Sequence, residues 1–140
     1  MSLFADQSRE QLRAAYRDAW RKWQQREVLQ PLEAQLADVI REHPEYQALL
    51  ASDASLADSF APEQVNPFLH LGLHLALREQ LATDRPAGIA AIHRRLCAEL
   101  GSAHEAEHRM IEPLAETLWE AQRAGRPPQE GAYLQRLWRL

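Results

Sequence analysis

The stretch that decides the fold is residues 66–81, with the sequence NPFLHLGLHLALREQL. Asn66 is a favourable N-cap residue and Pro67 suits the first turn of a helix, so the stretch opens with a helix start signal. Leucines stand at every second position from Leu69 to Leu77, but the stretch contains no β-branched residue and leucine is a good helix former, so a strand is not expected. Leu77 and Leu81 share a face with the two histidines of the stretch at the spacing of a 3.6-residue helix. The stretch therefore predicts a helix whose leucine-lined face also carries His70 and His74.

The same signals predict helices along the rest of the chain. Only five glycines occur, and good helix formers dominate the composition. Ser8 and Ser102 are each followed three residues later by Gln or Glu, the pattern of a capping box. We expect an all-α fold, a single helical domain over residues 1–140, as a small bundle of about five helices and a short C-terminal helix. The expected helices cover about residues 8–27, 31–43, 66–82, 84–100 and 102–124, with a turn at 46–50, a last helix around 133–138, and a loop over 52–66.

Histidines are the most informative side chains. Six occur, and four of them form two identical pairs, His70-x-x-x-His74 and His104-x-x-x-His108. Residues four apart lie on one helix face, with Cβ atoms about 5–6 Å apart. The companions of the first pair are leucines, and those of the second include Leu118 and Trp119 at helical spacing, so both pairs are expected to face the core.

Connectivity predicts that the two pairs meet. The links at residues 83–85 and at Gly101 are short, so the three helices from residue 66 to residue 124 should run up, down and up as antiparallel neighbours. The first and third of these helices then run in the same direction, and both histidine pairs fall within about 10 Å of one end of the bundle. His43, at the end of the preceding helix, is a further candidate for that end.

Core-facing imidazoles need partners, because an unpaired buried polar group costs about 1–3 kcal/mol. One solution is a divalent metal ion bound by His70, His74, His104 and His108, since facing helices of a bundle often build such sites. The remaining candidates, as ligands or as hydrogen-bond partners, are His43, Glu107 and Glu112. Such ligands suit iron or zinc, with nickel or manganese as alternatives, and such a site can bind a small ligand at the metal. The alternative is a non-enzymatic interaction module with structural, hydrogen-bonded or pH-sensing histidines.

Other motifs are weaker. Residues 104–108, HEAEH, match the H-E-x-x-H pattern of zinc peptidases, in which the Glu is a general base. Glu105 already belongs to the predicted capping box, however, and no sheet accompanies the motif. The sequence contains no phosphate-binding or dinucleotide-binding glycine motif and no G-x-S-x-G.

Composition excludes several classes of protein. Hydrophobic residues make up 46% and charged residues 26%, as in ordinary globular proteins. The net charge of −4 makes nucleic acid an unlikely partner, and no apolar run is long enough to span a membrane. The single cysteine, Cys97, excludes an internal disulfide, and residues 1–10 lack the pattern of a signal peptide, so we expect a cytoplasmic protein. The sequence does not define an oligomeric state or a substrate.

Four segments carry a family resemblance: REHPEYQALL (41–50), NPFLHLGLHLALREQLATDRPAGI (66–89), AEH (106–108) and GRPP (125–128). Together they resemble an uncharacterised proteobacterial family, the domain of unknown function family 1841. The resemblance covers nearly the whole chain, and it implies a small cytoplasmic bacterial protein without assigning an activity. The histidines and carboxylates on a bundle are also similar to those of hemerythrin-like and DinB-like metal-binding bundles, although only His108 with Glu112 offers the His-x-x-x-Glu pattern of hemerythrins.

Overall fold

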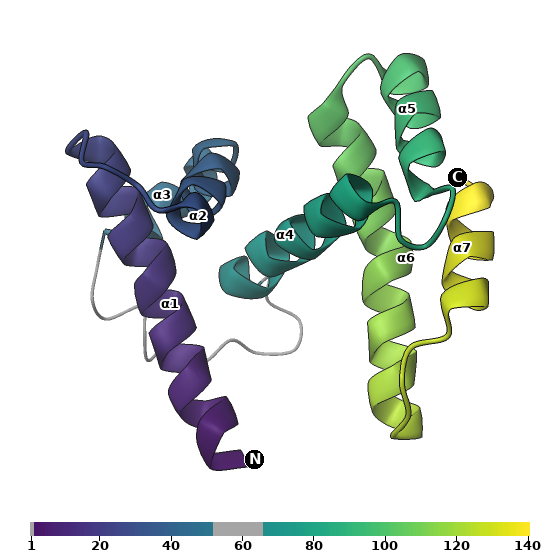
Figure 1. The fold of residues 1–140 in the computed structure, drawn as a ribbon, viewed down its shortest axis with the longest axis horizontal. Helices are drawn as coiled ribbons and strands as arrows, with labels where there is room; N and C mark the ends of the chain where they lie inside the picture. The colour runs from purple at the N-terminus through teal and green to yellow at the C-terminus, as the bar shows by residue number, and fades with distance from the viewer. Residues whose placement is uncertain (1, 52–65) are drawn as a thin grey trace. The chain divides into compact units, whose positions relative to one another are not determined.

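The fold is all-α, as the sequence predicts. The computed structural model describes residues 2–51 and 66–140, and within these ranges it contains helices and no β-strand (Figure 1). The predicted loop over residues 52–66 lies outside the described residues, apart from Asn66. The helices are α1 (Ser2–Gln24), α2 (Pro31–Arg41), the 3-10 helix η1 (Pro44–Tyr46), α3 (Gln47–Leu50), α4 (Pro67–Thr83), α5 (Ile89–Leu100), α6 (Ala103–Ala124) and α7 (Glu130–Trp138).

The chain divides into two compact units, Met1–Leu71 and Gly72–Leu140. The division falls inside α4, which is continuous from Pro67 to Thr83. Each unit therefore contains part of the same helix, and each is described by itself below.

In Met1–Leu71, α1 packs against α2 and α3. The buried apolar residues include Tyr16 and Ala19 of α1 with Val39 and Ile40 of α2, which the sequence places on the apolar faces. Helical spacing in the sequence predicts an apolar stripe on α1 that includes Leu12, but Leu12 is 55% exposed. Trp20 is buried instead, one position along from the predicted stripe.

In Gly72–Leu140, the core lies among α4, α5, α6 and α7. The antiparallel neighbours α5 and α6 turn at Gly101, and α7 packs against both of them (Figure 1). Burying one large aliphatic side chain contributes about 1.5–3 kcal/mol, so this cluster is the main source of stability of the unit. Its largest members are Leu77, Ile89, Ile92, Leu96, Met110, Ile111, Leu114, Tyr133 and Leu137.

Two of the predicted helix starts are confirmed by their side-chain caps. The Asn66 side chain accepts hydrogen bonds from the backbone N–H groups of Phe68 and Leu69, at 3.0 and 3.3 Å. The Ser102 hydroxyl accepts one from the backbone N–H of Glu105 at 3.2 Å. Each cap satisfies a backbone donor that the first helical turn leaves without an intrahelical acceptor.

Two other predicted helix starts are wrong. Ser8 is not an N-cap, because α1 begins at Ser2 and runs through it. The helix expected from about residue 84 begins at Ile89. Asp84 has a φ of 50°, and its carboxylate accepts hydrogen bonds from the backbone N–H groups of Gly88 and Ala90. Asp84 thus caps α5 from several residues before the helix.

Among the described residues, no helix has both the length and the apolar character needed to cross a membrane.

Candidate metal centre

Three imidazoles gather within Gly72–Leu140. The ring centroids of His104 and His108, one turn apart on α6, are 4.2 Å from each other. The ring of His74, from α4, lies 4.9 Å from that of His108 and 5.5 Å from that of His104. The structure therefore brings together three of the four paired histidines that the sequence singles out, on two different helices.

One of these imidazoles is fixed by a buried carboxylate. His74 is fully buried, and its Nδ1 lies 2.8 Å from Oε1 of Glu107. The Nε of Arg78 donates to the same oxygen at 3.1 Å. A carboxylate beside a guanidinium is ionised and can only accept, so Nδ1 of His74 carries the proton. The lone pair of neutral His74 is then on Nε2.

The charge on Glu107 is stabilised by these partners. Burial alone would raise the pKa of Glu107, but the hydrogen bond from His74 and the guanidinium of Arg78 outweigh burial and lower it. Glu107 is therefore ionised at neutral pH. Of the two carboxylates that the sequence offers, Glu107 is the one whose hydrogen bond to a core histidine the structure shows.

A second pair of imidazoles lies within Met1–Leu71. His43 is fully buried, and its ring centroid is 5.1 Å from that of His70. One nitrogen of each of these two residues lies within 4.8 Å of the other. The Nδ1 of His43 is 2.6 Å from the backbone oxygen of Val39, and because a carbonyl only accepts, this nitrogen carries the proton. The Nε2 of neutral His43 holds the lone pair.

The sequence candidates on α6 do not all share one environment. His104 and His108 are half-buried and Glu107 is buried, whereas Glu112 is exposed. Leu118 and Trp119 were expected in the core beside the second histidine pair, but they are 40% and 55% exposed. The inward face of α6 passes instead through Met110, Leu114 and Thr117. The error arose because the predicted buried face of α6 was wider than the face that the structure buries.

Glu105 occupies the helix cap and not a catalytic position. It is exposed, and its backbone N–H donates to Ser102 at the start of α6. The H-E-x-x-H match therefore gains no support as a peptidase motif.

Sequence reasoning missed Arg78. This residue follows His74 by four positions on α4, so the same spacing that pairs the histidines also places a guanidinium on their face of the helix. The signal was present in the spacing, but only the histidines of this face were considered. Arg78 is in fact about one third exposed and holds the carboxylate that fixes His74.

The ring separations are compatible with a shared metal ion. A zinc-bound imidazole nitrogen lies about 2.0–2.1 Å from the ion, so the centroids of two rings on a tetrahedral ion are about 5 Å apart. The His104–His108 and His74–His108 centroid separations are 4.2 and 4.9 Å, and one nitrogen of His74 lies within 4.8 Å of one of His108. The rings of His74 and His104 are 5.5 Å apart and stacked, with planes 1° apart, so one of them must turn before both can bind the same ion. Facing imidazoles on crossing helices, with one ring held by a carboxylate, form the arrangement that protein metal sites use.

The fold and this group of imidazoles define an all-α protein with a histidine-rich site between two of its helices. A family model, described as Domain of unknown function (DUF1841), matches residues 8–139, and the chain belongs to this family. Neither the curated proteins nor the solved structures compared with the chain gave a match. Because the family assigns no activity, the function is argued from the residues alone.

Proposed function

We propose that this protein binds a divalent metal ion through the histidines of α4 and α6. The observation that carries the proposal is the contact of His74, His104 and His108, with the Nδ1 of His74 bound to Glu107. A histidine ligand commonly donates its second N–H to a carboxylate, which orients the ring and makes the ligating nitrogen more basic. The pair His74–Glu107 has this form.

The fourth proposed ligand is His70. It precedes His74 by one turn on the continuous helix α4, so the two side chains lie on the same face of that helix. The pair on α4 then matches the pair on α6, as the sequence predicts. His43, the fifth histidine that the sequence offers, contacts His70 within Met1–Leu71, and its Nδ1 is bound to a backbone carbonyl.

Imidazole ligands favour zinc, iron or nickel over magnesium or calcium, and a carboxylate nearby also permits manganese. We favour iron or zinc. A set of three or four imidazoles without thiolates leaves room for water or a small ligand at the metal, as catalytic sites do. The substrate and the reaction are not part of the proposal.

A second function is supported by a different observation. Glu107 accepts a hydrogen bond from the imidazole of His74 at 2.8 Å and another from the guanidinium of Arg78 at 3.1 Å, and both bonds form without any metal. In this case the histidines would be structural, and the protein would be an interaction module. The experiment must therefore remove metal ligation and keep these hydrogen bonds.

The test measures the metal content of protein purified without a histidine tag from metal-replete medium. Elemental analysis for iron, zinc, nickel and manganese is combined with thermal melts before and after chelation. Because a ligand that binds only the folded state stabilises it, chelation should lower the melting temperature. If the protein contains only traces of metal and chelation does not change its melting temperature, only the interaction module remains as a function.

Matched variants assign the ligands. His74→Asn keeps an N–H at the position of Nδ1, and with it the bond to Glu107, but removes Nε2. We expect His74→Asn and His108→Ala to lose the metal and the effect of chelation. His93→Ala is the control, since His93 is a histidine of α5 that contacts Cys97 and is not among the proposed ligands, and this variant should retain the metal. Retention of metal by His74→Asn and by His108→Ala would exclude these residues as ligands.

A further inference from the structure

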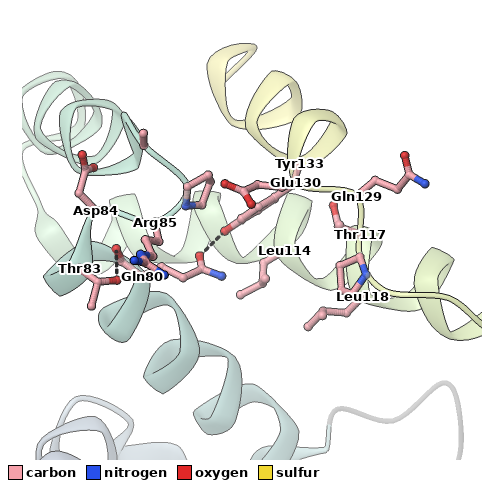
Figure 2. A pocket seen from close by; sticks show the side chains of 13 residues that line it. Gln80, Thr83, Asp84, Arg85, Leu114, Thr117, Leu118, Gln129, Glu130 and Tyr133 are labelled. Atoms are coloured by element: carbon pink, nitrogen blue, oxygen red, sulfur yellow. Dashed lines mark hydrogen bonds between the residues drawn. The ribbon is translucent and has the colours of Figure 1, made fainter.

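A pocket separate from the imidazoles lies within Gly72–Leu140 (Figure 2). Its volume is about 700 Å³, within the range of pockets that bind small molecules. The pocket begins with Gln80 on α4 and includes Leu114 on α6, each six residues beyond His74 and His108, so about 9 Å further along each helix. It therefore does not depend on the proposed metal site.

The floor of the pocket combines two nearly fully buried side chains with one partly buried hydrogen bond. The buried side chains are Leu114 and Thr117, and Leu118, which is 40% exposed, lines the same pocket. The hydroxyl of Tyr133 donates to Oε1 of Gln80 at 2.6 Å (Figure 2). Burial raises the pKa of Tyr133, so this hydroxyl keeps its proton at all physiological pH values.

The bond to Tyr133 decides what Gln80 can offer to a ligand. Since Oε1 of Gln80 accepts from Tyr133, the amide nitrogen of Gln80 remains as a donor. Arg85 lines the same pocket, and its backbone N–H donates to the backbone oxygen of Gln80 at 3.0 Å. The guanidinium and the amide both donate, so this wall favours an acceptor, and above all a carboxylate.

A negative charge lies on a different wall of the pocket. Glu130, in the first turn of α7, also lines the pocket. Asp84 is the other acid there, but its carboxylate already accepts the N–H groups of Gly88 and Ala90 and caps α5. Arg85 and Glu130 are thus a cation and an anion on two walls around an apolar floor.

We propose that this pocket binds a small zwitterion with an apolar side chain, of the chemical class of a free apolar amino acid. The ligand carboxylate contacts Arg85 and the amide of Gln80, its ammonium group contacts Glu130, and its side chain covers Leu114 and Leu118. Arg85 and Glu130 each place a charge opposite to one charge of the ligand, which fixes its orientation.

The test is a titration of the full chain, labelled with ¹⁵N and treated with chelator, because amino acids themselves coordinate metals. The three probes are L-phenylalanine, 3-phenylpropionate, which lacks the amine, and 2-phenylethylamine, which lacks the carboxylate. We expect L-phenylalanine to bind most tightly and to shift the amide signals of residues 80–87 and 129–133. Absence of such shifts with all three probes, or binding of 3-phenylpropionate as tight as that of L-phenylalanine, would overturn the proposal.

Variants separate the two charges. Gln80→Glu keeps an acceptor for Tyr133 and replaces the donor by an acid, so it should weaken L-phenylalanine binding about tenfold. Glu130→Gln should weaken L-phenylalanine about fivefold and leave 3-phenylpropionate unchanged or tighter, because the charge it removes contacts only the amine. Arg139→Gln is the control, an exposed arginine outside the pocket, and should bind like the unaltered protein. Equal effects of Glu130→Gln and Arg139→Gln would contradict the assignment of Glu130.

Discussion

His43 and His74 are both fully buried, and both have the Nδ1 proton bound to an oxygen, but the oxygens differ. For His43 the acceptor is the backbone carbonyl of Val39, one helical turn earlier on α2, which is neutral and fixed by the helix itself. For His74 the acceptor is the ionised carboxylate of Glu107, which comes from another helix and is held by Arg78.

The difference shows that one residue type can be fixed in a core locally or over a long distance. A carbonyl orients the ring without changing its charge balance, whereas a carboxylate also stabilises positive charge on the ring or on a metal bound to it. We therefore expect His74 to respond strongly to changes in its acceptor. For His43, no side-chain substitution can remove the acceptor.

The largest expected effect concerns the acceptor of His74. Glu107→Ala removes a carboxylate that accepts hydrogen bonds from both His74 and Arg78, so metal-free protein should lose about 2–3 kcal/mol in free energy of unfolding. Glu107→Gln keeps a carbonyl acceptor, as His43 has, and should lose about 1 kcal/mol. Urea denaturation at neutral pH measures both values. Equal losses for the two variants would mean that the acceptor contributes nothing beyond packing.

The next effect concerns metal affinity. Glu107→Gln turns the partner of His74 from an anion into a neutral amide, and loss of such a partner typically costs at least about tenfold in affinity. We expect a decrease of about tenfold, measured by competition with a chromogenic chelator. Glu112→Gln provides the matched control, because Glu112 is exposed on the same helix. If the two variants have the same metal affinity, Glu107 does not act on the metal through His74.

A smaller effect is expected at His43. His43→Ala removes the ring and the bond to Val39, while His43→Asn keeps a donor at the position of Nδ1. We expect His43→Asn to be more stable than His43→Ala by about 1 kcal/mol, the net contribution of one hydrogen bond. Thermal or urea denaturation of metal-free proteins measures the difference. A His43→Asn variant no more stable than His43→Ala would show that the local bond does not hold the ring.

The sequence predicted those parts of the fold that depend on neighbouring residues. Asn66 and Ser102 cap their helices as expected, since a cap involves only the next three residues. The pairing of His74 with Glu107 joins residues 33 positions apart, and sequence periodicity could place each on a core-facing side without identifying which carboxylate would be the partner. Glu112, at the favourable spacing from His108, was an equal candidate, and only the fold separates it from Glu107.

The errors have physical causes of the same kind. Leu118 and Trp119 continue an apolar pattern, but tertiary packing buries only a narrower face of α6. The start of α5 was misplaced because Asp84 and Pro86 look like an N-cap followed by a first-turn proline. The left-handed conformation of Asp84 instead displaces the helix to Ile89.

The smallest expected effect concerns the carboxylate of Asp84, which is exposed, whereas Glu107 is buried. The backbone N–H groups of Ala90 and Gly88 lower the pKa of Asp84. A lowered pKa means that ionised Asp84 stabilises the folded chain above the usual pKa of an aspartate, and that this contribution disappears as the pH falls through the lowered value. Asp84→Asn keeps an acceptor and loses the charge. Its small deficit in stability at pH 7 should shrink in acid, and a deficit independent of pH would contradict the charge effect.

The last helix, α7, has a consequence for kinetics. A helix of nine residues is too short to persist alone in water, so Glu130–Trp138 is helical only while it is packed against α6 and α5. Its docking depends on Leu137 in the core and on Arg136, which contacts Thr117 and Glu120 of α6. The amide protons of α7 should therefore exchange with solvent together, at a rate set by undocking. Because Tyr133 of this helix lines the pocket, the same exchange rate reports how often α7 separates from the other residues of the pocket.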